Sequence, residues 1–271
     1  MTSTVDTTPP AGLMTGRIAL VTGGVGAIGD AIARRFAREG ARVIVADLDG
    51  EAASTAATQI AADTGAEVIG IGVDVTDVDA LERAAITLER QVGVCDAIVA
   101  NAGVLMLGPA LELTPRAWNT VINVNLTGAF YTASVFARRL VAAHKPGTIV
   151  FSSSLFGVRG GPGNSAYSAS KFGLLGLSQS MAAELAPRQV RVNAVCPGQV
   201  DTVMLDELFQ RRAATSGRSA AEERDAFTSR IPLGRLGSVD EVSGAFLYLS
   251  SSLSDYVTGQ HLIVDGGWQV A

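Results

Sequence analysis

The feature that most constrains the fold is a glycine-rich turn set between two short apolar segments. Residues 17–22 form an almost uninterrupted apolar run, the pattern of a strand buried on both faces. The turn GGVGAIG follows, then a helical pattern that ends at Gly40, then a second strand over 42–46 that closes on Asp47. This order of strand, glycine turn, helix, strand and acid is typical of a βαβ unit that binds a dinucleotide.

The glycines of this turn suit a bound pyrophosphate. Glycine lets the backbone turn sharply and approach the phosphates, and the first N–H groups of the following helix can hold them. Read as G-x-G-x-x-G, the turn matches at Gly24, Gly26 and Gly29. We therefore expect a nucleotide cofactor at this turn.

Asp47 indicates which cofactor binds. At the end of the second strand its carboxylate can accept hydrogen bonds from both hydroxyls of the adenosine ribose, and its charge would repel a 2′-phosphate. Neither Val25, Gly26 nor Leu48 supplies a compensating cation. We therefore expect NAD rather than NADP. The alternative role for Asp47 is that of an ordinary helix N-cap.

The alternation of strands and helices continues to the end of the chain. The sequence predicts further strands over 66–73, 96–100, 147–153, 190–195 and 261–264. It predicts helices near 50–63, 78–91, 115–143 and 238–249, and one after Gly163 that carries Tyr167 and Lys171. Strands separated by helices pair in parallel through right-handed crossovers. We predict an α/β fold: a Rossmann-like, doubly wound sheet of seven parallel strands, with helices on both faces, in a single domain.

Two segments depart from this alternation. Residues 1–15 are rich in Thr and Pro and are expected to form a flexible extension ahead of a cofactor-binding domain over 16–271. The polar stretch 201–235 follows the carboxyl end of a strand, where ligands bind in such sheets, and is expected to be a substrate loop or lid. Its apolar residues are candidates for covering a pocket: Met204, Leu205, Leu208 and Phe209.

Composition excludes several classes of protein. The net charge is 21 − 26 = −5, which argues against nucleic acid or an anionic membrane surface as a partner. No apolar run approaches the ~18 residues of a membrane span, so we expect a cytoplasmic protein. Cys95 and Cys196 are expected to be buried free thiols. His144 and His261 have no companions at metal-ligand spacing, so we expect no metal.

Tyr167 and Lys171 form a second candidate site. Residues four apart in a helix lie on one face, which places a phenol beside an ammonium. A nearby cation favours the phenolate and lowers the tyrosine pKa, which makes the phenol usable as an acid or base. Only two lysines occur in the chain, Lys145 and Lys171. The pair alone is a weak signal, and its weight comes from the motifs around it.

Together the motifs resemble the short-chain dehydrogenase/reductase family, from Gly16 to the end of the chain. The turn is similar to that family's glycine loop, with Ala27 where the family usually has a glycine, and Ala100 replaces the Asn that commonly precedes Asn-Ala-Gly. The resemblance implies cofactor contacts at Gly23, Gly26, Ile28, Gly29, Asp47, Leu48, Asp74, Val75, Asn101, Ala102, Gly103, Tyr167, Lys171, Pro197, Gly198, Val200 and Thr202.

The resemblance also implies a catalytic group. Asn125 matches the Asn that supports the active-site helix and a proton-relay water, and Tyr167 and Lys171 match the acid/base and its partner. Ser154 lies thirteen residues before Tyr167 and three before Gly157, the family spacing of the substrate-orienting serine, which its neighbours Ser152 and Ser153 do not meet.

The expected function is NAD-dependent hydride transfer to or from a secondary alcohol. The segment 204–236 looks most like members that oxidise polyols, sugar alcohols or vicinal diols, and a 3-oxoacyl-thioester reductase is the alternative. Two other functional classes fit the sequence less well. A nucleotide-sugar epimerase or dehydratase usually needs a further substrate domain. A non-catalytic NAD-sensing protein would not need the acid/base group. By the same resemblance we expect a homotetramer.

Overall fold

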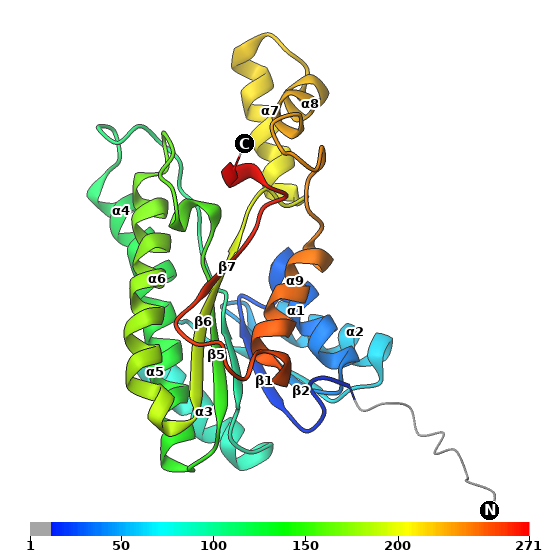
Figure 1. Cartoon of the computed structure of the whole chain (residues 1–271), viewed down its shortest axis with the longest axis vertical. Coiled ribbons are helices and arrows are strands. Elements are labelled where there is room, and N and C mark those ends of the chain that lie inside the picture. The colour runs from blue at the N-terminus through cyan, green and yellow to red at the C-terminus, as the bar shows by residue number, and fades with distance from the viewer. Residues whose placement is uncertain (1–11, 271) are drawn as a thin grey trace, which may run out of the picture.

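A parallel sheet of seven strands runs through the centre of the molecule (Figure 1). This computed structural model describes residues 12–270, except for the side chains at 203, 204, 207, 208, 211, 212 and 215. The strand order is β3-β2-β1-β4-β5-β6-β7, and every neighbouring pair is parallel. The strands are β1 (Ile18–Thr22), β2 (Arg42–Asp47), β3 (Val68–Gly72), β4 (Ala97–Ala100), β5 (Gly147–Ser152), β6 (Val190–Pro197) and β7 (His261–Val264). The predicted fold class is confirmed.

Helices cover both faces of this sheet (Figure 1). On one face lie α3 (Val78–Gln91), α5 (Gly128–Ala142) and α6 (Ser165–Leu185), and on the other α1 (Ala27–Arg38), α2 (Gly50–Thr64) and α9 (Val239–Ser250). Because side chains alternate along a strand, Leu20 of β1 enters the first core and Val21 enters the second. Both faces of the central strands are therefore buried beneath helices, which explains their continuous apolar sequences.

The carboxyl ends of β1 and β4 form the point where the strand order reverses. β1 lies between β2 and β4, so the connections that follow β1 and β4 run to opposite sides. Ligands bind in the crevice that such a reversal leaves. The glycine turn after β1, Asp47 at the end of β2 and Asn101 after β4 all lie at this edge.

The expected flexible extension over 1–15 is wrong at its inner boundary. Met14 is fully buried in the second core, and its backbone N–H donates to Glu39 O at 2.9 Å. Gly12 packs so closely against the backbone of Glu39 that a side chain would not fit. The packed domain therefore includes Gly12 and Met14, and residues 1–11 lie outside the described part of the chain.

The stretch 201–235 is not the loop that its polarity suggested. It forms two helices, α7 (Val203–Ser216) and α8 (Ala220–Thr228), which rise above the sheet beside the C-terminal turn (Figure 1). Leu205 and Phe209 are buried in a third cluster with Leu155, Phe227, Ile231, Leu236 and Trp268. The side chains of Met204 and Leu208 lie outside the described residues.

The long helix expected over 115–143 is interrupted. Thr114 caps α4 (Pro115–Ile122) by accepting from Ala117 N, as its Thr-Pro sequence predicts. The turn Asn123–Thr127, η1, is a π-helix, and α5 continues from Gly128. Such π turns are rare and cluster at functional sites. This one carries Asn125.

Among the described residues, no helix is both long and apolar enough to span a bilayer. Nor do three or more His, Cys, Asp or Glu side chains gather there in a way that could hold a metal ion. The expected absence of a metal stays a prediction.

Candidate active site

Tyr167 and Lys171 lie one turn apart near the start of α6. Lys171 is 4% exposed, and its Nζ lies over the Tyr167 ring, 5.5 Å from the ring centre. The ammonium donates to the carbonyl of Ser152, at the end of β5, at 2.7 Å. The sheet edge therefore fixes the lysine, and the lysine in turn lies against the tyrosine.

Ser154 brings its hydroxyl to the same place. It follows β5, and its Oγ accepts from Phe156 N at 3.1 Å, which caps the short 3-10 turn η2 (Leu155–Gly157). The Ser154 hydroxyl also lies within reach of the Tyr167 phenol and acts on its pKa as a hydrogen-bonding partner. The ring of Phe156 meets the Tyr167 ring edge-on, with centres 6.4 Å apart, and so restricts its orientation.

The two neighbouring serines hold Lys171, Ser152 through its backbone carbonyl and Ser153 through its hydroxyl. Ser153 Oγ donates to the backbone carbonyl of Lys171 at 2.9 Å, which ties β5 to α6. Gly157 packs against this same hydrogen bond, because a side chain there would meet Ser153 Oγ and the Lys171 backbone. Ser154, rather than Ser152 or Ser153, therefore presents its hydroxyl to the phenol.

Asn125 is buried within the π turn, where its side chain holds α6 in place. Its Oδ1 accepts from Val104 N at 2.7 Å, while its Nδ2 donates to Val104 O at 2.9 Å and to Ser170 Oγ at 3.2 Å. The amide therefore joins the segment after β4 to α6. With both polar atoms of the side chain engaged, the geometry favours a positioning role over direct proton relay.

The pKa of Tyr167 differs from the expectation. Burial raises this pKa, and the hydrogen bond with Ser154 partly opposes that effect. The predicted lowering by Lys171 is not the dominant influence, because the ammonium lies over the ring and is itself desolvated. Burial lowers the pKa of Lys171 to about 8.

The glycine turn is shaped for a close ligand. Gly23 has φ +62°, and a side chain there would meet Ala102 Cα at 2.7 Å. A side chain at Gly29 would collide with the carbonyl oxygen of Gly23. Helix α1 begins beyond Gly26 with no side-chain cap, which leaves its first N–H groups available to an anion. Ile28, half-buried, packs against the second core.

Asp47 faces this turn. Its Oδ2 accepts from Val25 N at 3.1 Å and its Oδ1 from Leu48 N at 2.8 Å. The N-cap alternative is wrong, because Asp49 is the residue that caps α2. Leu48 is 74% exposed beside it.

Two of the expected cofactor contacts, Asp74 and Val75, follow β3. Asp74 Oδ1 accepts from Thr76 N at 2.8 Å and from Thr76 Oγ1 at 2.7 Å, which closes a turn. Val75 is 8% exposed and fits against Gly128, where a side chain would approach Val75 to 2.7 Å. The first residue of α5 thus helps to place this segment.

Thr22 was not predicted as a site residue, yet it holds the two cofactor segments together. Its Oγ1 accepts from Asn101 N at 3.1 Å and from Ala102 N at 3.2 Å. The Asn101 side chain in turn donates to Thr22 O at 3.2 Å and to Gly23 O at 3.1 Å. A side chain at Gly103 would lie 3.3 Å from Asn125 Oδ1. The sequence signal that could have identified Thr22 is a threonine at the end of a buried strand.

The segment from Pro197 to Thr202 completes the edge. Gly198 N donates to Val264 O at 2.8 Å, and a side chain there would strike Asp265. Val200 is buried in the second core. Thr202 precedes α7 without capping it, and within the described part of the chain its hydroxyl makes one weak contact, to Val200 O at 3.4 Å. That hydroxyl is well placed to bind a ligand.

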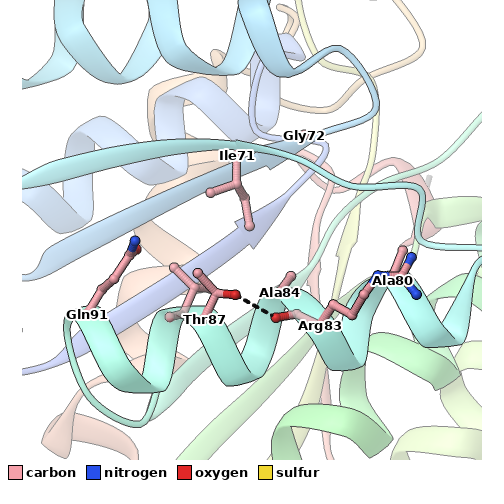
Figure 2. A pocket seen from close by; sticks show the side chains of 8 residues that line it. Ile71, Gly72, Ala80, Arg83, Ala84, Thr87 and Gln91 are labelled. Carbon is pink, nitrogen blue, oxygen red and sulfur yellow. Dashed lines mark hydrogen bonds between the residues drawn. The ribbon is translucent and has the colours of Figure 1, made fainter.

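A hollow of about 300 Å³ lies elsewhere, between β3 and α3 (Figure 2). Small residues such as Gly72, Ala80 and Ala84 leave this space beneath Ile71. The Thr87 hydroxyl bonds to Arg83 O within its own helix, as Figure 2 shows. β3 is the edge strand, and none of the lining residues belongs to the catalytic or cofactor sets. We assign this hollow no function.

Comparison with known proteins places this site in a family. Residues 23–269 match the family described as enoyl-(acyl carrier protein) reductase. The chain is 34% identical over 256 residues to the 3-oxoacyl-[acyl-carrier-protein] reductase of Chlamydia trachomatis, covering 94% of this chain and 98% of that one. It is 35% identical over 258 residues to the L-rhamnose 1-dehydrogenase (NAD(P)(+)) of Azotobacter vinelandii, covering 94% and 97%.

A solved structure agrees with these relatives. The short-chain type dehydrogenase/reductase of Mycobacterium marinum superimposes with a TM-score of 0.86 and 33% sequence identity, covering 95% of this chain and 97% of that one. Sequence and fold thus agree over nearly the whole domain. The chain belongs to the short-chain dehydrogenase/reductase family of NAD(P)-dependent oxidoreductases.

Proposed function

We propose that this protein is an NAD-dependent dehydrogenase in which Tyr167 is the general acid/base. One observation carries the proposal: the half-buried Tyr167 side chain lies beside the Ser154 hydroxyl and beneath the Lys171 ammonium. A hydroxyl and a phenol can then bind one substrate oxygen together, with a positive charge beside them. This arrangement serves proton transfer to or from an alcohol.

The residues present fit a dinucleotide. Gly23 and Gly29 have no room for side chains, α1 begins without a side-chain cap, and Asp47 lies against the turn. These groups would hold the pyrophosphate and the adenosine ribose, and Thr202 would bind the carboxamide. When bound, the nicotinamide accepts or returns the hydride.

The protein's own residues would handle the proton. Ser154 and Tyr167 bind the alcohol oxygen, and Tyr167 takes the proton as the carbon loses hydride. Lys171 stabilises the negative charge on the phenolate, and the carbonyl of Ser152 holds Lys171 in place. Asn125 fixes α6 against the segment after β4. Positioning by these groups supplies much of the acceleration.

We infer that NAD is preferred over NADP. Asp47 presents a carboxylate next to Val25 and Leu48, two uncharged residues that cannot neutralise a 2′-phosphate. A cofactor with two free ribose hydroxyls gains hydrogen bonds from this carboxylate, whereas a phosphorylated one meets a like charge. The preference favours the oxidative direction.

The favoured substrates are polyols, sugar alcohols and vicinal diols. A sugar dehydrogenase among the relatives supports this class. A second candidate, reduction of 3-oxoacyl thioesters, is supported by the reductase relative of similar identity. We further propose a cytoplasmic homotetramer, and that the helices α7 and α8 act as the substrate lid.

A cofactor-resolved screen tests the proposal. Purified enzyme is assayed with NAD⁺ and NADP⁺ across polyols, diols and sugars, and in reverse with acetoacetyl-coenzyme A and NADH or NADPH. We expect NAD⁺ reduction with a member of the first group. Turnover of the thioester with NADPH alone would establish the second candidate instead, and no turnover of any substrate would contradict both.

A further inference from the structure

A second hollow, of about 430 Å³, lies beside the catalytic serine's segment. It is lined by Arg159, Ser229, Arg230, Pro232 and Trp268. These residues come from three places: the turn after Ser154, the chain just beyond α8, and the C-terminal turn η5 (Trp268–Val270). The hollow thus lies where the substrate lid meets the catalytic segment.

Arg230 is held in a fixed place at this hollow. Its guanidinium carbon lies 4.6 Å from the centre of the Trp268 ring. Trp268 is 8% exposed and packs against Phe227, with ring centres 5.0 Å apart. A guanidinium stacked on a rigid aromatic face keeps its N–H edge free for a ligand and loses little entropy on binding.

The two arginines of the hollow also carry uncompensated charge. Among the described residues, no carboxylate forms a salt bridge with Arg159 or Arg230. On the same lid Arg224, by contrast, bridges Asp201 at 2.8 Å and Asp206 at 3.0 Å. The hollow therefore has two positive groups with no anion of the described chain to neutralise them.

Arg159 is close to the reacting groups along the chain. It lies five residues after Ser154, and its backbone N–H donates to Leu155 O at 3.1 Å, so the intervening segment is a compact turn. At a rise of about 2 Å per residue, that segment spans roughly 10 Å. A substrate of a few carbons held at Ser154 can extend toward the hollow.

We propose that Arg159 and Arg230 form a subsite for an anionic group at the far end of the substrate. The inference rests on the proposed dehydrogenase function and narrows its substrate class to secondary alcohols that bear a carboxylate or a phosphate. Guanidinium groups bind either anion through paired N–H donors. The neutral polyol of the same length lacks this interaction.

Equilibrium binding tests the subsite without depending on turnover. The Tyr167→Phe enzyme, saturated with NAD⁺, is titrated calorimetrically with D-gluconate, D-glucitol 6-phosphate and neutral D-glucitol. We expect at least one anion to bind about tenfold or more tightly than D-glucitol, the range for hydrogen bonds to charged groups. Which of the two binds more tightly distinguishes carboxylate from phosphate recognition. Equal binding of all three would overturn the proposal.

Substitutions locate the effect. Introducing Arg159→Gln or Arg230→Gln should each reduce the anion preference about tenfold, and Arg230→Lys should restore only part of it, because lysine keeps the charge without the fork. Arg218→Gln removes the same charge from the exposed turn between α7 and α8 and serves as the matched control. A loss of preference in the control equal to that in the two variants would show a diffuse surface field and refute the subsite.

The subsite and the enzyme assignment fail separately. If the wild-type enzyme oxidises neutral alcohols but shows no arginine-dependent anion binding, the subsite is refuted and the dehydrogenase proposal stands. If anions bind through Arg159 and Arg230 but no alcohol in the screen is turned over, the subsite is supported and the dehydrogenase proposal fails.

Discussion

The Nζ atom of Lys171 lies over the face of the Tyr167 ring, 5.5 Å from its centre. Sequence spacing alone placed the two residues on one helical face, but it suggested a cation acting directly on the phenol oxygen. In the structure the hydroxyl interacts with Ser154, and the ammonium is anchored to Ser152 O. Burial, rather than the lysine charge, dominates the pKa of the tyrosine.

Replacing Tyr167 with Phe removes the proton-transferring hydroxyl and little else. The ring still packs against Phe156, so the fold should persist. Because general acid/base catalysis contributes roughly 10²–10⁴-fold, kcat should fall by about that factor. NAD⁺ affinity, measured by fluorescence titration, should change little. Near-normal turnover would show that another group carries the proton.

Lys171 should make stability depend on pH. Burial lowers its pKa from 10.5 to about 8. Between these values the unfolded chain binds a proton that the folded chain has released, so the free energy of unfolding should rise with pH, by up to roughly 1.4 kcal/mol per unit. Below about pH 8 both states are protonated and the slope vanishes.

The variant Lys171→Met isolates this contribution. Urea unfolding of both proteins between about pH 7 and 9.5 gives the difference in unfolding free energy, in which titration of Cys95, a group that Lys171 does not influence, cancels. That difference should be flat at first and then grow in favour of the wild type as the pH passes about 8. A difference that falls over this range would contradict the buried, easily deprotonated lysine.

Sequence patterns predicted the elements that depend on interactions between residues close together in the chain. The glycine turn, the strand that ends at Asp47 and the helix near 238–249 all appear as expected, and Ser238 and Glu241 start that helix with a capping box. Helices α7 and α8 were missed, although Ser219 and Glu222 form the same kind of capping box. The polarity of this segment favoured the prediction of a loop or lid, although the capping box indicated the start of a helix.

Other features depend on contacts between distant residues and left no pattern in the sequence. The π turn places Asn125 against Val104, twenty-one residues away, and no local preference indicates it. Thr22, at the end of β1, accepts a hydrogen bond from the backbone N–H of Asn101, which follows the neighbouring strand β4. Met14 is buried because it packs beneath the end of α1, beside Glu39. Each of these required the tertiary structure.

Asp47 should control cofactor choice. In the double variant Asp47→Ser with Leu48→Arg, the repelling carboxylate is gone and a cation can bind the 2′-phosphate. Each change alters a hydrogen bond or contact with a charged group, so the ratio of kcat/KM for NADP⁺ to that for NAD⁺ should rise about 100-fold. Wild-type enzyme that already favours NADP⁺ would refute the assigned role.

Gly29 should tolerate no side chain. A methyl group there would collide with the carbonyl oxygen of Gly23 and displace the turn from the start of α1. Gly29→Ala should therefore weaken NAD⁺ binding by about tenfold or more, at a stability cost of roughly 1–3 kcal/mol. Gly244→Ala, in α9 with nothing within 4 Å of the added methyl, is the control and should bind NAD⁺ normally. Equal affinities in all three proteins would contradict a steric role.

Asp96 should matter for stability and not for catalysis. It is 3% exposed at the amino end of β4, opposite the site, where it binds Arg17 Nε at 2.7 Å, Lys145 Nζ at 2.6 Å and Ile18 N at 3.1 Å. Asp96→Asn leaves these two cations without their counter-charge, which should cost about 3 kcal/mol in urea unfolding.

The surface pair of Arg35 with Asp240 provides the comparison. Asp240 is 66% exposed, so Asp240→Asn should cost less than about 1 kcal/mol. Both variants should keep the kcat of the wild type, since neither residue contacts the site. If Asp96→Asn unfolds at the same urea concentration as Asp240→Asn, the buried network contributes nothing beyond a surface pair. A loss of kcat without a loss of stability would instead place Asp96 in the catalytic machinery, contrary to its position in the sheet.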